Sequence, residues 1–151
     1  SHVAQFLVGH EEWRRTLADL HRTLVPSGLL VFDARDPADR RWERWNPRDS
    51  LHRVALPDGT GVEVWSEVGE VQGDVVSFAM NYRFPDGAEL GSPAQLRFRS
   101  EDELRDSLTA AGFTVEAVYG GWHREPVGHS DGELLVVARS GATEPLDFGR
   151  G

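Results

Sequence analysis

The chain has 151 residues and a net charge of -9 at pH 7, and it contains no cysteine and no lysine. This length allows one domain with a real hydrophobic core, and no apolar run approaches the ~20 residues that span a bilayer. Without cysteine, disulfides, thiol catalysis and cysteine metal sites are excluded. We see no signal peptide, so we expect a cytoplasmic protein with no membrane partner. The use of arginine for every basic residue is typical of a GC-rich bacterial gene.

The negative charge is concentrated in the second part of the chain. Residues 1–56 carry nine arginines against eight acidic residues, whereas residues 57–151 carry seven arginines against seventeen acidic residues. Binding to nucleic-acid phosphates requires a basic face. We therefore expect no nucleic-acid partner, and favour a small molecule or a protein as substrate.

The first third of the chain predicts a helix followed by a strand. Residues 11–24 carry a helical apolar stripe, formed by Trp13, Leu17, Leu20 and Leu24. Residues 26–28 (Pro-Ser-Gly) end this helix. The continuous apolar run at residues 29–33 predicts a strand covered on both faces. Asp36 and Pro37 then predict the N-cap and first residue of a short helix through about Trp45.

Residues 51–99 change to a period of two, which predicts antiparallel strands. The clearest apolar stripe consists of Val76, Phe78, Met80, Tyr82 and Phe84. Turn dipeptides interrupt the pattern at Asp58-Gly59, Gly73-Asp74 and Asp86-Gly87. The segment is therefore predicted to be an antiparallel meander of about four strands.

The final third returns to a helix and two strands. Residues 100–103 (Ser-Glu-Asp-Glu) form a capping box, and Gly112 ends the helix that it begins. Residues 113–119 and 133–138 are predicted to be strands joined by a loop. The segment 140–151 has no period and is predicted to be a disordered tail.

Two segments of the chain resemble a known family. Residues 10–37 combine an amphipathic helix, a Pro-Ser-Gly turn and an apolar strand. Residues 98–122, followed by 133–139, give a helix, Ala-Gly-Phe, a strand, a loop and a last strand. In this order they resemble the C-terminal portion of a class I S-adenosylmethionine-dependent methyltransferase of the small-molecule type. The resemblance implies an α/β, partial Rossmann-like fold over residues 1–139, with an antiparallel insertion at 51–99. The family's last three strands, which this chain would contain, lie in the spatial order fifth, seventh and sixth.

The chain lacks the part of this family that holds the cofactor. No Gly-x-Gly loop links a strand to a helix, because Gly59 and Gly61 lie between alternating strands and predict a hairpin turn. We therefore expect this chain alone to bind S-adenosylmethionine weakly and to be inactive. The strand at 29–33 would expose an apolar edge, which predicts a homo-oligomer unless residues 1–8 or the absent half cover it.

The resemblance also implies site residues before the first helix, near the transferred methyl group. His2 is then a catalytic candidate, and Val3, Gln5 and Phe6 are cofactor-binding candidates. A remnant of an affinity tag would equally explain Ser1-His2. A surface glutamine is the favoured alternative for Gln5.

Four further residues are candidates for substrate binding: Arg35, Trp42, Tyr82 and Trp122. Packing in the core is the favoured alternative for Trp42 and Tyr82. Trp45, three residues after Trp42, likewise either packs or forms part of an aromatic wall for substrate. His123 is a second catalytic candidate, against the alternative of an exposed loop histidine. The spacing of His123 and His129, with Asp131 and Glu133 nearby, is unspecific for a metal, and no metal site is predicted.

A second function remains open from the sequence. The chain could be a non-catalytic α+β domain whose meander binds a ligand or dimerises. A strand-Gly-x-Gly-helix segment upstream in the gene would favour the enzyme over this alternative.

Overall fold

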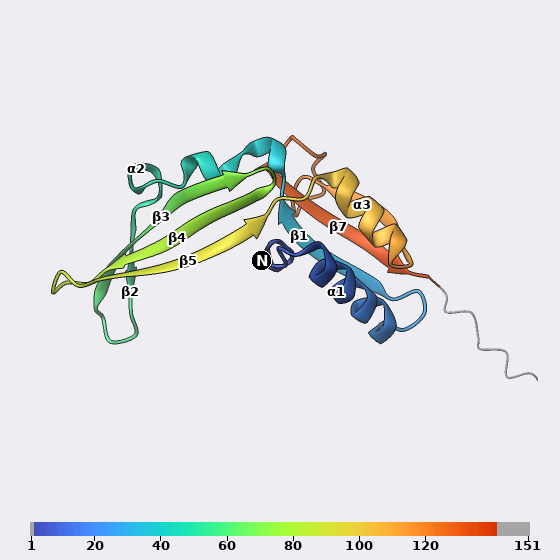
Figure 1. Cartoon of the computed structure of the whole chain (residues 1–151), viewed down its shortest axis with the longest axis horizontal. Coiled ribbons are helices and arrows are strands. Elements are labelled where there is room, and N and C mark those ends of the chain that lie inside the picture. The colour runs from blue at the N-terminus through green and yellow to red at the C-terminus, as the bar shows by residue number, and fades with distance from the viewer. Residues whose placement is uncertain (1, 142–151) are drawn as a thin grey trace, which may run out of the picture.

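Two antiparallel β-sheets form the frame of the molecule and lie side by side in Figure 1. The computed structural model describes residues 2–141. One sheet has the order β1-β7-β6, with β1 at Leu29–Arg35, β6 at Phe113–Tyr119 and β7 at Glu133–Ser140. The other has the order β2-β3-β4-β5, with strands at His52–Ala55, Gly61–Gln72, Val75–Arg83 and Glu89–Arg97. The predicted α/β fold with an antiparallel meander is confirmed.

Two helices pack against one face of the three-stranded sheet, α1 at His10–Thr23 and α3 at Glu101–Ala110. Their buried side chains meet alternate residues of the strands in one core, which includes Trp13, Leu17, Ala34, Leu104, Leu108, Leu134, Val136 and Ala138. The Trp13 indole N–H donates a hydrogen bond of 3.0 Å to the Ser107 hydroxyl and so links the two helices. The apolar stripe predicted for α1 therefore faces this core.

The opposite face of the same sheet is covered only in part in residues 2–141, where Leu135 is buried but the start of β1 is not. Leu29 and Val31 are each 48% exposed, so the prediction of a strand covered on both faces is wrong for this chain. The reason is that α1 and α3 both cover one face, and alternate side chains of β1 point to the other.

β1 is also an edge strand, with β7 on one side. The Asp36 N–H donates to the Gly132 carbonyl, and the Ser140 N–H donates to the Gly28 carbonyl, each at 2.8 Å. Even-numbered residues of β1 therefore pair with β7, and odd-numbered residues direct their backbone groups to the open edge. β7 runs antiparallel to both neighbours, so β1 and β6 run in the same direction.

The four-stranded sheet carries three short helical turns on one face. They are η2 at Pro37–Asp39, η3 at Arg41–Arg44 and α2 at Pro47–Ser50. The short helix predicted to run to Trp45 is instead broken after η2, because Arg40 adopts a positive φ of 46°. The predicted N-cap is confirmed, since the Asp36 carboxylate accepts a hydrogen bond of 2.9 Å from the Ala38 N–H.

Aromatic residues hold these turns on the meander. The rings of Trp42 and Phe98 meet edge to face with their centres 4.6 Å apart, and the ring centres of Trp45 and Phe78 are 5.0 Å apart. Beneath them lies a second core of Val76, Leu96 and Phe98. The three predicted hairpin turns are confirmed by positive φ angles at Gly59, Gly73 and Gly87.

The N-terminal segment lies where the two sheets meet. Its 3-10 turn η1, at Val3–Phe6, contacts both β1 and β5. The Arg99 side chain donates a hydrogen bond of 2.7 Å to the Leu7 carbonyl, and its guanidinium lies 4.8 Å from the centre of the Trp13 ring. Burial, with Arg97 nearby, lowers the pKa of Arg99 to about 10. The segment is therefore fixed to both halves of the molecule.

At the other end of the chain, β7 continues to Ser140, which is buried. Residues 142–151 of the predicted tail lie outside the described residues. Within residues 2–141, no helix has both the length and the hydropathy that crossing a membrane requires.

The capping box predicted for α3 is confirmed. The Ser100 hydroxyl accepts from the Glu103 N–H, and the Glu103 carboxylate accepts from the Ser100 N–H at 2.7 Å. Ser100→Ala should therefore lower the free energy of unfolding by about 1 kcal/mol, measured by urea denaturation. Ser92→Ala, at an exposed position of β5, should change the midpoint little. An equal midpoint for the two variants would remove the capping box as a source of stability.

Candidate functional site

A hollow of about 600 Å³ lies at the carboxyl end of β1. Open α/β sheets bind ligands at the carboxyl ends of their parallel strands. Among the residues lining the hollow are His2, Asp33, Arg41, Trp45, Trp122 and Glu133. They come from the N-terminal segment, strands β1 and β7, the turns over the meander and the loop after β6.

A histidine and two carboxylates meet on the wall of this hollow. The His2 Nε2 lies 2.7 Å from Glu133 Oε2 and 3.6 Å from Asp33 Oδ2. The His2 backbone N–H also donates a hydrogen bond of 2.9 Å to Asp33 Oδ1. Because an ionised carboxylate only accepts, the Nε2–H of His2 donates this hydrogen bond to Glu133. All three side chains are largely buried, with exposed fractions of 17%, 12% and 15% for His2, Asp33 and Glu133.

The pairing of β1 with β7 brings these carboxylates together. Arg35 lies directly opposite Glu133, and Asp33 is two residues earlier on the same strand. Alternate residues of a strand share a face, so Asp33, Arg35 and Glu133 all point to the face that the helices leave open. Two negative charges, on the wall of the hollow, are thereby placed next to the positive charge of Arg35.

Gln5 fixes the arginine of this group. Its side-chain carbonyl accepts from the Arg35 backbone N–H and from Arg35 Nη1, each at 3.3 Å. Gln5 is only 1% exposed, so the favoured interpretation as a surface glutamine is wrong. Its position in η1, between β1 and β5, places it inside the molecule. Gln5 thereby also occupies the Arg35 backbone N–H, which faces the open edge of β1.

Burial lowers the pKa of the Arg35 guanidinium. Glu133 and Asp33 act against this shift by favouring the charged form, whereas the positive charge of Arg41 adds to it. The guanidinium lies 5.6 Å from the centre of the Trp45 ring. Its Nε and the Nε2 of Gln5 are buried without a hydrogen-bond partner among residues 2–141. Arg35 is therefore held by Gln5 and Trp45 beside two carboxylates.

Of the residues predicted from the sequence, the structure brings His2, Arg35 and Trp122 to this region. Trp122 lines the hollow and is 66% exposed. Trp42 packs against the second core, which agrees with the favoured alternative of core packing and not with substrate binding. Tyr82 lies in the meander opposite Val64 and Leu90, away from the hollow lining.

The remaining candidates do not line the hollow. Val3 and Phe6 are more than half exposed on η1. His123 is 92% exposed at its side chain and lies beside Glu125. In the described part of the chain, it is His2 that pairs with Glu133, and neither His123 nor His129 does so.

The sequence analysis missed Asp33 and Glu133 as partners in one site. Asp33 was included in the apolar strand, and Glu133 was noted only at the start of the last strand and near the unspecific pair His123 and His129. The predicted spatial order of fifth, seventh and sixth strands contained a usable signal. Because it makes those two strands neighbours, it places the end of one near the start of the other.

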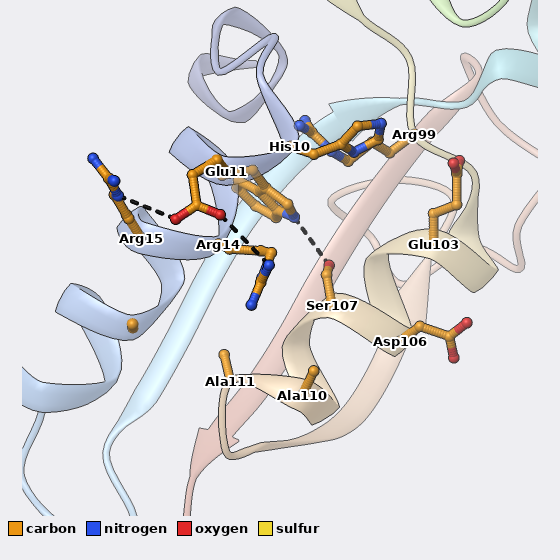
Figure 2. A pocket seen from close by; sticks show the side chains of 12 residues that line it. His10, Glu11, Arg14, Arg15, Arg99, Glu103, Asp106, Ser107, Ala110 and Ala111 are labelled. Carbon is orange, nitrogen blue, oxygen red and sulfur yellow. Dashed lines mark hydrogen bonds and ion pairs between the residues drawn. The ribbon is translucent and has the colours of Figure 1, made fainter.

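A second hollow, of about 650 Å³, lies between α1 and α3 (Figure 2). Its rim carries exposed ion pairs such as Glu11 with Arg15, and its lining includes the small residues Ala110 and Ala111. It lies on the helical side of the sheet and contains none of the residues predicted as a site. The hollow at the carboxyl end of β1 is therefore the better candidate.

Solved structures with a similar fold are S-adenosylmethionine-dependent methyltransferases. The CcbJ methyltransferase of Streptomyces caelestis matches with a TM-score of 0.70 and 20% identity, over 94% of this chain and 55% of that one. A methyltransferase of Clostridium acetobutylicum has a TM-score of 0.67 and 10% identity, over 93% and 56%. CalS10, an amino pentose methyltransferase of Micromonospora echinaspora with S-adenosylmethionine bound, matches with a TM-score of 0.64 and 22% identity. The match covers 93% of this chain and 55% of that one.

The chain has the fold of part of an S-adenosylmethionine-dependent methyltransferase. It spans just over half the length of these structures. No family model matches the chain, and no curated protein sequence matches it. The partial Rossmann-like arrangement implied by the sequence resemblance is thus confirmed at the level of the fold.

The role of Gln5 gives a test of this site. Gln5→Ala removes the acceptor for Arg35 and leaves two buried donors unpaired, so the free energy of unfolding should fall by about 1–3 kcal/mol. Val3→Ala, at an exposed position of the same turn, should stay within about 0.5 kcal/mol of the parent chain. Urea denaturation measures both. Equal stability of the two variants would show that the Gln5–Arg35 contact does not hold η1 in place.

Proposed function

We propose that this chain is the C-terminal, substrate-side part of an S-adenosylmethionine-dependent methyltransferase that acts on a small molecule. One observation carries the proposal: a β1-β7-β6 sheet with helices on one face and an open edge at β1, in a chain that matches about half of each similar methyltransferase. Such a sheet is near the lower limit of what is stable alone. The intact protein is proposed to supply a strand beside β1 and cover for Leu29 and Val31.

The cofactor belongs to the intact protein in this proposal. S-adenosylmethionine supplies the methyl group when bound. Of the three residues predicted to contact it, Gln5 is already engaged by Arg35, and Val3 and Phe6 are exposed at the molecular surface. These residues therefore fit the border of a cofactor cleft and not a complete one, and the chain alone is proposed to be inactive.

The hollow at the end of β1 is the proposed acceptor side. Methyl transfer depends mainly on aligning the acceptor with the sulfonium carbon, so a shaped wall contributes more than a reactive group. Trp122 offers an exposed ring, and Arg35 a fixed positive charge. His2, oriented by Asp33 and Glu133, is positioned to accept a proton from an acceptor that has one to lose.

A non-catalytic, dimerising domain is the second candidate, and the open face of β1 is the observation that favours it. Exposed apolar residues on a sheet face and an unpaired edge both promote association. The two candidates differ in what an upstream extension of the chain should do.

Calorimetry with S-adenosylmethionine distinguishes the methyltransferase from the dimerising domain. The chain as given should show no saturable binding, whereas the chain extended upstream to its gene's start should bind the cofactor and transfer its methyl group to small-molecule acceptors. Low-micromolar binding by the chain alone would show that the absent half is dispensable. An extended chain that binds no cofactor would exclude the methyltransferase function and leave the dimerising domain.

The open face also predicts the state of the chain alone. We expect a dimer or larger oligomer by light scattering at micromolar concentration, with either the β1 face or the apolar face of the meander at its centre. Val31→Glu should favour the monomer if the β1 face is used, because it places a charge in the buried contact. Val25→Glu, at an exposed position between α1 and β1 and outside both of these faces, is the matched control. A monomeric parent chain would contradict the prediction.

A further inference from the structure

One cluster in residues 2–141 brings a histidine and two carboxylates close enough to share an ion. The ligand atoms of His2, Asp33 and Glu133 all lie within 4.8 Å of one another. Imidazole nitrogen and carboxylate oxygen are ligands of zinc and manganese ions. We propose that these three residues form a binding site for one divalent transition-metal ion at the wall of the hollow.

Both distances from His2 to the carboxylates require little movement to accept an ion. Bonds of about 2.1 Å from a tetrahedral ion place neighbouring ligand atoms about 3.4 Å apart. His2 Nε2 lies 3.6 Å from Asp33 Oδ2, which is close to this separation. Its distance of 2.7 Å to Glu133 Oε2 is that of a hydrogen bond and opens by under an ångström when an ion replaces the proton. Both carboxylates belong to paired strands, so their backbone positions are already fixed.

The local charge favours a cation. With a neutral imidazole, Asp33 and Glu133 contribute two negative charges against the single positive charge of Arg35. Arg41 and Arg44, which line the hollow, share the one carboxylate of Asp39, whereas Asp49 and Asp131 add two further negative charges to the lining. The cluster therefore has unbalanced negative charge, which either a proton on His2 or a metal ion on the same nitrogen would offset.

The surroundings leave room to complete the coordination. The three side chains are largely buried, yet they line a hollow of about 600 Å³ from which water or a ligand atom can reach an ion. Three protein ligands plus an open position is the arrangement of metal sites that bind exogenous ligands. Metal binding here does not depend on the proposed function, because the three ligands belong to this chain.

The sequence analysis predicted no metal site because it compared spacings along the chain. His2, Asp33 and Glu133 are too far apart in sequence for any spacing motif to include them. The candidate that spacing did offer, His123 with His129, is not assembled in the described residues.

Isothermal titration calorimetry tests the proposal. The chain, without an added affinity tag, is first treated with a chelator and then titrated with Zn²⁺ and, separately, with Mn²⁺. We expect saturable uptake of about one ion per chain. His2→Ala should weaken the affinity at least about tenfold. His123→Ala is the matched control, because it removes one histidine from an exposed loop position and should leave the affinity unchanged.

Glu133→Gln provides a second variant with almost the same shape, and circular dichroism shows whether each variant remains folded. It should also weaken binding, because an amide is a poorer ligand than a carboxylate. If neither ion binds saturably to the parent chain, the proposal is overturned. An equal loss of affinity in His2→Ala and His123→Ala, or full affinity in a folded Glu133→Gln, would overturn it as well.

Discussion

The pairing of β1 with β7 is the constraint on which the rest of the structure depends. It places a strand that begins the sheet beside the strand that ends the described chain, in a register of seven residue pairs. That register sets Arg35 opposite Glu133, with Asp33 on the same face. It also decides which side of β1 stays free, because each strand residue has hydrogen-bonding groups for one neighbour only. The candidate site and the open edge therefore have one origin.

The N-terminal segment converts this edge into a site. Without η1, the carboxyl end of β1 would present Arg35 and two carboxylates to solvent. Gln5 satisfies the Arg35 backbone and side chain, and His2 pairs with both carboxylates. Because buried polar groups are costly unless they are hydrogen-bonded, these contacts are mutually required. Arg99 holds the same segment through the Leu7 carbonyl and thereby joins the site to the meander side of the molecule.

Two physical situations coexist on the three-stranded sheet. Its helical face is packed by residues such as Leu17 and Leu108, which are fully buried. Its other face shows Leu29 and Val31 at the surface, together with an unpaired backbone edge. A strand with this composition is normally covered on both faces. This asymmetry is expected of a chain whose fold matches only about half of each similar methyltransferase. It underlies the proposals on both cofactor binding and association.

The sequence by itself determined the local structure. Helical spacing gave α1, the capping box gave α3, and period two with Asp-Gly and Gly-Asp turns gave the meander, because these signals act between neighbours along the chain. It also suggested the order of the three-stranded sheet through a family resemblance. Only the tertiary structure decided that Gln5 is buried, that Trp42 is core while Trp45 lines the hollow, and that His2 meets Asp33 and Glu133. Those contacts join residues far apart in sequence, so strand register and packing, not local periodicity, determine them.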